Sequence, residues 1–444
     1  MSPRRSAPGR RLVAVLAVAA GAFGIFAASQ VGHPYRPALP PAGSATAGPT
    51  LAPRGAIAST WFCAEGTAFA NGRADETVLI ANVAPRTVTA TVTVMAGSAR
   101  PVTRRLSVAA FGQRRVPVST LATAAEPGVV VEVPGSGGVV EHELSSGSND
   151  TIGPCARQAT TDWYFSGGNT GVGAEDWLAL FNPFGDDAIV DVTFLTSTGV
   201  EAPGAAQAVV VPRRSRVSLP LHVIVPDHQA LAFHVHARLG RLIAEQSIST
   251  DGSNGPAGLT TMLGVAAPAT TWRIPALDAQ SGTAATLSIA NFANVGTRTR
   301  LNFTLDQHAT LPANRLTVPS MAVTETWAAP AAVAGMSATV GAAASARRWV
   351  FTTGRLDTAD PAQVVAFNTT GRRLRVTLLT AGSAAAALHP VSTMTVGAHQ
   401  RAVFPLDATI GPDQVLVLQA TGRIVGGRLV LGPSVITGIG VPDP

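Results

Sequence analysis

Short runs in which apolar and polar residues alternate recur along most of the chain, separated by Gly, Pro, Asn and Asp. A period of two predicts β-strands with one face on a core, and the turn residues between them predict an all-β protein. The clearest stretch is residues 162–249, where seven such runs follow one another. Seven strands in roughly 90 residues are typical of an immunoglobulin-like (Ig-like) β-sandwich.

The strands expected in this stretch cover 162–165, 177–182, 188–195, 207–212, 216–221, 230–238 and 241–249. The last two are expected to form a hairpin around Leu239-Gly240. The same reasoning predicts final hairpins over 129–133 with 139–144, and over 415–419 with 423–431.

The pattern returns four times. Each unit opens at a Trp, and its second strand ends at an Asn 19 to 21 residues later: Trp61 and Asn82, Trp163 and Asn182, Trp272 and Asn291, Trp349 and Asn368. Three units also have a Gly five residues after the Trp: Gly66, Gly168 and Gly354. Units of this length predict an array of domains and not a propeller, whose blades are about 40–50 residues long.

We therefore expect four tandem β-sandwich domains at 59–158, 159–268, 269–346 and 347–444. The third is expected to be degenerate. It lacks the Gly after the Trp, has Trp327 where the other units have a Pro-ended strand, and its final hairpin is shortened around 336–340.

Four arginines at the N-terminus precede an uncharged run from Leu12 to Ala28. This predicts a signal peptide or a membrane anchor over residues 1–29, with the N-terminus cytoplasmic and the remaining chain outside. Residues 30–58, rich in Pro and Ala, are expected to form an extended stalk. The expected location is the extracytoplasmic face of the cell membrane, where the segment contacts the membrane, or the secreted fraction.

The positive charge is confined to the tail. Six of the 32 basic residues precede Glu65, the first acidic residue, and the remaining 26 equal the number of acidic residues. A sandwich array without net charge is not expected to bind nucleic acid. All the basic residues are Arg, which excludes a P-loop lysine and a Schiff base.

The two cysteines, Cys63 and Cys155, bracket the first unit. In an exported protein these cysteines are expected to form a disulfide that connects the first and last strands of the first unit.

The second unit contains a series of motifs: Trp163-Tyr164-Phe165, Gly168, Glu175-Asp176, residues 178–183 (Leu-Ala-Leu-Phe-Asn-Pro), residues 211–217 (Val-Pro-Arg-Arg-Ser-Arg-Val) and Ile243-Ala244-Glu245-Gln246. This series resembles a family of exported or membrane-anchored actinobacterial proteins of unknown function, built from tandem Ig-like units. The resemblance implies an envelope location and β-sandwich modules, and it supplies no catalytic residues.

Several side chains are candidates for binding. The tryptophans, Trp163 among them, would stack on sugars if exposed, but a repeated aromatic residue beside a strand is more often core. The Asn residues are expected to close turns. Arg213, Arg214 and Arg216 cluster at one turn, with Arg114 and Arg115 at the matching place in the first unit, and could meet anionic wall polymers.

Three acids, Glu141, Glu143 and Glu245, are the only candidates for hydrolase chemistry, in which two carboxylates flank a glycosidic bond. They lie at repeated positions, so we expect them instead to pair with cross-strand arginines such as Arg238 and Arg241. His234 and His236 share a strand face and could hold a metal, with a third ligand from His222, His228 or elsewhere. Solvated imidazoles are the default, so no metal, cofactor or catalytic residue is predicted.

These observations favour a non-catalytic envelope protein that scaffolds or binds a wall glycan or an envelope protein. One alternative is an accessory domain array or weak hydrolase acting on a cell-wall polymer through those acids, and another is a plain spacer. The oligomeric state is left open.

Overall fold

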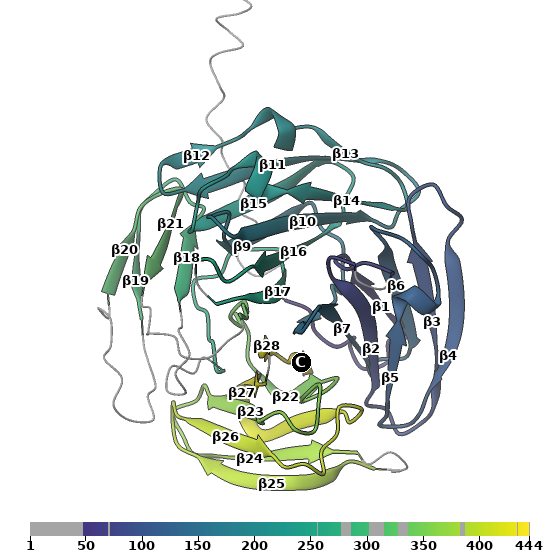
Figure 1. Ribbon diagram of the computed structural model, residues 1–444. Helices are drawn as coiled ribbons and strands as arrows, with labels where there is room; N and C mark the ends of the chain where they lie inside the picture. The colour runs from purple at the N-terminus through teal and green to yellow at the C-terminus, as the bar shows by residue number, and fades with distance from the viewer. Residues whose placement is uncertain are drawn as a thin grey trace, which may run out of the picture. The chain divides into compact units, whose positions relative to one another are not determined.

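The computed structural model describes residues 48–69, 72–254, 256–276, 286–301, 315–326, 336–381, 387–432 and 434–443. The expected N-terminal hydrophobic segment, most of the stalk and Trp327 lie outside these ranges. Within them, no helix combines the length and hydrophobicity needed to cross a membrane. Strands dominate the described residues, which confirms the all-β class (Figure 1).

Sandwich 1 consists of two four-stranded antiparallel sheets, with the orders β1-β6-β3-β4 and β5-β2-β7-β8. In β3, buried Val and Ala alternate with more exposed Thr and Met, as the period of two requires. The strands are β1 (Ala58–Cys63), β2 (Asp75–Asn82), β3 (Val88–Met95), β4 (Val102–Val108), β5 (Gln113–Pro117), β6 (Gly128–Pro134), β7 (Gly138–Ser146) and β8 (Asn149–Pro154).

Sandwich 2 repeats this topology. Its sheets have the orders β12-β11-β15-β9, with β13 also on β11, and β14-β10-β16-β17. The strands are β9 (Asp162–Gly168), β10 (Ala174–Asn182), β11 (Ala188–Thr196), β12 (Gly199–Glu201), β13 (Val209–Val211), β14 (Ser215–Pro220), β15 (Leu231–Leu239), β16 (Ile243–Thr250) and β17 (Gly258–Leu263).

Sandwich 4 follows the same plan, but its two halves are joined by one long strand, β27. One half has the order β25-β24-β27-β22-β29; in the other, β23 pairs with β26 and β27, and β28 pairs with β27. The strands are β22 (Ala346–Phe351), β23 (Ala362–Asn368), β24 (Leu374–Thr380), β25 (His389–Val396), β26 (Arg401–Leu406), β27 (Leu416–Leu431), β28 (Val435–Ile439) and β29 (Val441–Asp443).

The third unit, as far as it is described, retains part of the plan. Its strands β18 (Leu287–Asn291) and β21 (Ala322–Thr326) pair with each other, as do β19 (Thr297–Arg300) and β20 (Arg315–Val318). These correspond to the second-to-fifth and third-to-fourth pairings of sandwich 1. The prediction of a shortened hairpin at 336–340 is wrong, because these residues form no strand.

The final hairpins predicted for the other units are also wrong. β6 and β7 are consecutive but lie in different sheets, as do β15 and β16, and the two segments expected in sandwich 4 are parts of β27. The chain crosses between the two layers here instead of turning back within one. A hairpin within one sheet and a crossing between two sheets both show alternating strands with a turn residue between them. The sequence pattern therefore does not distinguish the two arrangements.

The strand pairing only partly matches an immunoglobulin sandwich. The second strand pairs with the fifth, and the third with the sixth, as in that fold. However, β7 pairs with β2 and not with β6, and β4 pairs with β3 and not with β5. The described sandwiches therefore have two layers and a pairing order of their own.

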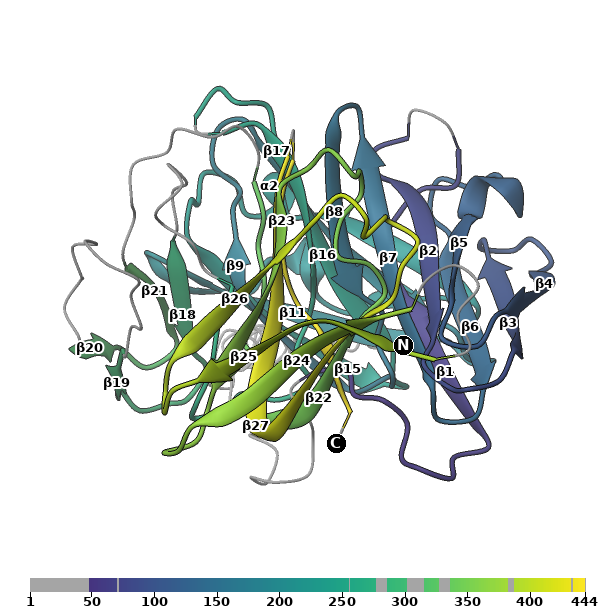
Figure 2. The same cartoon turned by 90° about the horizontal axis from the view of Figure 1, so that it is seen from below.

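Each complete sandwich has a further strand near its C-terminal end that the sequence did not predict: β8, β17 and β28. β8 lies against both β17 and β28, so these strands of three sandwiches meet. Figure 2 shows β8 beside β17. Buried side chains also cross the boundaries. Val350 and Val441 pack in the core of sandwich 1, and Leu79 packs in the core of sandwich 4. Accordingly, Pro40–Pro444 form one compact unit.

Candidate functional site

Three of the four repeat tryptophans are core residues, as expected: Trp61, Trp163 and Trp349 are at most 3% exposed. Trp163 donates from Nε1 to the carbonyl oxygen of Leu242, and Trp349 to that of Ile424, at the place where the chain crosses between layers. Trp163 is therefore not available to stack on a glycan. Trp272, in the third unit, is 36% exposed.

The repeat asparagines all close the same turn, which confirms that prediction. Asn182 accepts the N–H of Phe184 at Oδ1 (3.1 Å) and donates from Nδ2 to the carbonyl of Asp186 (2.8 Å). The same two bonds, two and four residues ahead, are made by Asn82, Asn291 and Asn368. The third unit thus keeps this turn although it lacks other features of the repeat.

Glu245, on β16, reaches from sandwich 2 into sandwich 1. Its side chain is fully buried. Oε2 accepts the backbone N–H groups of Ala64 (3.1 Å) and Glu65 (3.0 Å), and Oε1 lies 2.6 Å from Nε2 of His142 on β7. The expected pairing with cross-strand arginines is wrong for this residue, and Glu245 is not a surface binding group.

Glu141, on β7, makes the same kind of contact with sandwich 4. Its Oε2 accepts the backbone N–H (2.9 Å) and the hydroxyl (2.5 Å) of Thr352, just after β22. The guanidinium of Arg428 on β27 donates to both carboxylate oxygens, at 3.0 and 2.7 Å. All these groups are buried.

The two contacts are one joint used twice, which we call the Glu joint. In each, a glutamate accepts an N–H three residues after the opening Trp of the neighbouring sandwich. The glutamate also binds a basic side chain of the neighbouring sandwich, His142 or Arg428. This basic residue comes directly after the position that is equivalent to the glutamate. The equivalent pairs are Glu141 and Glu245, Thr352 and Ala64, and Arg428 and His142. Hydrogen bonds from the backbone complete each buried carboxylate, which burial of a charge requires.

Arg216, a predicted surface group, is only 4% exposed and contributes to the boundary between sandwiches 1 and 2. It donates to the carbonyl oxygens of Gly66 (2.5 Å) and Pro127 (3.2 Å), and to Glu65 (3.4 Å). Glu65 also binds Arg73 at 2.8 Å. Although burial alone would raise the pKa of Glu65, these two guanidinium groups lower it.

By contrast, Arg213 and Arg214 are exposed, as expected. The backbone N–H of Arg213 donates to Asp187 (2.9 Å), and Arg214 adopts a positive φ of 52° at the tip of the turn. Their side chains remain available for an anionic partner. In sandwich 1, Arg115 instead forms an ion pair with Glu143, across the intervening strand β2. Glu143 is thus paired with an arginine, as expected, whereas Arg238 pairs with Asp191 and Arg241 lies over Phe184.

His142 lies between two buried carboxylates, with Nδ1 3.1 Å from Glu76 and Nε2 bonded to Glu245. Burial alone would lower the pKa of His142, but Glu245 and Glu76 raise it to about 10. Burial raises the pKa of Glu76 to about 6, against the effect of His142. The central imidazole is therefore a cation at neutral pH.

The equivalent pair in sandwich 2 is Asp176 and Gln246. Gln246 Nε2 donates to both oxygens of Asp176 at 2.8 Å, and the N–H of Asn169 adds a third bond. Because no cation is among these partners, burial raises the pKa of Asp176 to about 7. This acid is fully buried.

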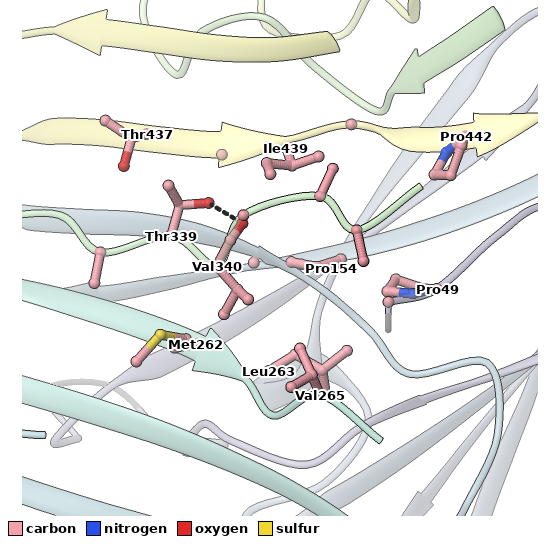
Figure 3. Close-up of a pocket in the computed structure, with 18 of the residues that line it drawn as sticks. Pro49, Pro154, Met262, Leu263, Val265, Thr339, Val340, Thr437, Ile439 and Pro442 are labelled. Atoms are coloured by element: carbon pink, nitrogen blue, oxygen red, sulfur yellow. Dashed lines mark hydrogen bonds between the residues drawn. The ribbon is translucent and has the colours of Figure 1, made fainter. Parts of the chain in front are cut away.

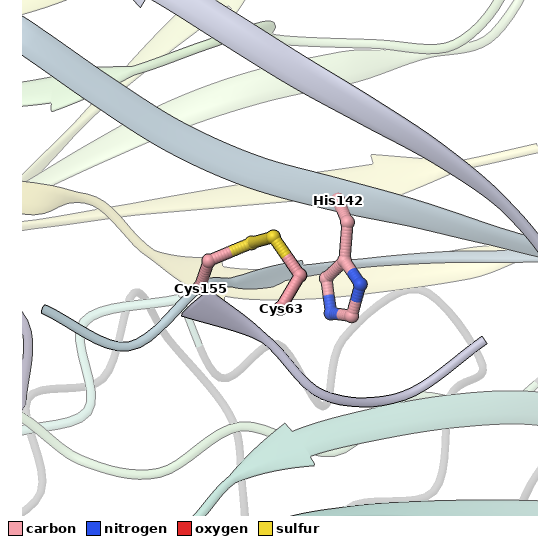
Figure 4. A group of neighbouring side chains, drawn as sticks. All are labelled: Cys63, His142 and Cys155. Atoms are coloured by element: carbon pink, nitrogen blue, oxygen red, sulfur yellow. A yellow bond between two sulfur atoms is a disulfide. The ribbon is translucent and has the colours of Figure 1, made fainter. Parts of the chain in front are cut away.

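Cys63 and Cys155 form the predicted disulfide, next to His142 (Figure 4). Two thiolates and an imidazole would suit a metal ion, and these three groups lie within 4.8 Å of one another. The sulfur atoms are bonded to each other, however, so this cluster offers no thiolate ligands.

The third neighbour of the histidine pair on β15 is Asp162 on β9. His234 Nε2 and His236 Nδ1 each lie 2.9 Å from its Oδ1, whereas the sequence analysis left the choice open among His222, His228 and other residues. His234 is buried and His236 is not, so the expectation of solvated imidazoles is wrong for His234.

A hollow of about 100 Å³ lies where segments of all four units approach one another (Figure 3). Its lining includes Pro154, Leu263, Val340 and Ile439, and none of its lining residues is charged. Ligand-binding clefts are usually about 300–1,000 Å³ with a few polar groups that converge. This hollow contains no acid or base for catalysis.

Residues 151–326 match the model of a family of unknown function, DUF5719. The match begins in β8 and includes sandwich 2 and the described strands of the third unit. No curated protein matches the chain. A crystal structure of a tetra-tandem repeat in the extending region of a large adhesion protein is similar over 87% of this chain and 100% of that one, at 13% identity. Its TM-score of 0.12 does not indicate a shared fold.

Proposed function

We propose that this protein is a non-catalytic module of the cell envelope, exported or anchored by its N-terminal segment, that scaffolds or binds partners outside the membrane. The observation that supports this best is the Glu joint. Glu141 and Glu245, the acids that a hydrolase would need, are fully buried and bonded to backbone N–H groups of neighbouring sandwiches. Glu143, the remaining acid, is paired with Arg115.

The disulfide supports an extracytoplasmic location, because such bonds persist mainly in oxidising compartments. Mass-tagging of free thiols in intact cells tests this part of the proposal. An oxidised Cys63–Cys155 pair that becomes reactive only after reduction agrees with export. Two thiols that react without reduction contradict it.

The binding role is tested by co-sedimentation of the purified protein with insoluble cell-wall material at low and moderate salt. We expect saturable binding that survives moderate salt and falls on Arg213→Ala/Arg214→Ala. Arg372→Ala/Arg373→Ala is the matched control, since it removes an exposed arginine pair from sandwich 4. Binding lost with salt, or equally reduced by both variants, contradicts a specific wall site and directs the search to protein partners.

A further inference from the structure

Three metal-ligating groups converge on one face of sandwich 2. In the antiparallel pair β9–β15, Asp162 lies opposite His236, and Tyr164 lies opposite His234. Since side chains two residues apart share a strand face, all four lie on the same side of the sheet. The other face of these strands contributes Trp163, Phe233 and Val235 to the core.

The ligand atoms are close enough to share one ion. Asp162 Oδ1 lies 2.9 Å from both His234 Nε2 and His236 Nδ1, and all three atoms lie within 4.8 Å of one another. In a tetrahedral zinc site, bonds of about 2.0–2.2 Å place neighbouring ligand atoms roughly 3.3 Å apart. The two distances from Asp162 to the histidines therefore need to lengthen by only a few tenths of an ångström.

Neighbouring groups hold the ligands in place. The ring of His234 stacks on Tyr164, with centroids 4.3 Å apart and planes 8° apart, and Phe292 packs edge-on against Tyr164. Thr161 donates its hydroxyl to Asp162 Oδ2 (2.7 Å), which orients the carboxylate with Oδ1 toward the histidines. Such second contacts are characteristic of built metal sites.

We propose that Asp162, His234 and His236 bind a divalent transition-metal ion of the zinc class. Two imidazoles and a carboxylate suit Zn²⁺ and its borderline neighbours better than Ca²⁺ or Mg²⁺, which prefer oxygen ligands alone. The side chains of His236 (47% exposed) and Asp162 (25%) give the ion access and leave a further position for water. Asp191, across from His236 on β11, is paired with Arg238 and is not counted as a ligand.

The site is separate from the Glu joints and from Arg213 and Arg214, so its failure would leave the proposed function untouched.

The test is titration of the purified full-length protein, free of any histidine tag, with Zn²⁺ by isothermal calorimetry. Visible absorption on addition of Co²⁺ provides a second readout. We expect one ion per chain with micromolar or tighter affinity, weakened at least tenfold by Asp162→Asn and by His236→Gln. Both side chains are partly exposed, so these variants should fold, and thermal unfolding without metal verifies this. His389→Gln, an exposed histidine on β25, is the control.

The absence of one-to-one binding in the wild-type protein would overturn the proposal. So would binding that both variants retain, which would place the ion elsewhere. Loss of binding in His389→Gln to the same extent would also contradict it.

Discussion

Glu245 Oε1 lies 2.6 Å from His142 Nε2, across the boundary between two sandwiches, and both side chains are fully buried. We expect Glu245→Gln to lower the free energy of unfolding by about 3–5 kcal/mol, because it removes one of the two buried carboxylates that stabilise the His142 imidazolium. The amide N–H₂ of the introduced glutamine would also face backbone N–H groups, which cannot accept a hydrogen bond. Urea unfolding measures this loss. Glu175→Gln, an exposed glutamate on the paired strand β10, should stay within about 0.5 kcal/mol of wild type. Equal stability of the two variants would contradict a structural role for Glu245.

Arg216 and Arg213, three residues apart, should respond very differently to substitution. Arg216→Ala removes a buried guanidinium that holds Glu65 and two carbonyl groups, so we expect a loss of about 3–5 kcal/mol. Arg213→Ala removes an exposed side chain and should change stability by less than about 0.5 kcal/mol. Thermal and urea denaturation of both proteins provide the comparison. A stable Arg216→Ala protein would show that sandwiches 1 and 2 do not depend on this ion cluster.

The buried Asp176 predicts a specific dependence of stability on pH. Its pKa of about 7 in the folded protein exceeds the value near 3.9 of an unfolded chain, so the folded state holds the proton more tightly. The stability that this proton contributes is complete below about pH 4 and is lost as the pH rises through 7. Asp176→Asn has no such loss. It should therefore gain stability relative to wild type between pH 4 and 8, by up to about 4 kcal/mol.

The substituted amide also has a suitable partner, since Gln246 Oε1 is buried without a hydrogen bond in the structure described. Urea unfolding at pH 4.5 and pH 8 measures the difference. Glu175→Gln, exposed on the same strand, is the control and should show little change. A constant difference between Asp176→Asn and wild type would mean that Asp176 is ionised at both pH values.

The disulfide should contribute strongly to stability. Cys63 and Cys155 are separated by 92 residues, and closure of a loop of this size contributes roughly 4–5 kcal/mol in the chain-entropy model. Cys63→Ser/Cys155→Ser should lower the urea midpoint accordingly, and chemical reduction of the wild type should reproduce the change. An unchanged midpoint would show that the contacts between sandwiches alone hold the first unit.

Local features of the chain were readable from sequence, whereas contacts between units were not. Alternation located most strands, and the Asn turns were correct in all four units because their hydrogen bonds are local. β8, β17 and β28 were missed because they do not alternate regularly: β17 is buried throughout, and β8 and β28 each contain adjacent buried residues.

The candidate site was less predictable. Alignment of the repeats shows that Glu141 and Glu245 are equivalent, but it does not show that their partners lie in another sandwich. Asp162 was missed for a related reason. The register that places it opposite His236 is a property of the folded sheet, and no spacing in the sequence indicates it.

The bond between Glu141 and Arg428 joins residues separated by 287 positions, and Leu51 donates its N–H to the carbonyl of Pro442 nearby. The last sandwich thus closes onto the first, and the two ends of the described chain lie side by side. The packing of the units therefore does not depend on which unit comes first in the chain. A circularly permuted form of residues 48–443, with these two ends joined by a short linker and new ends opened in the exposed turn at Ser148, should assemble the same joints.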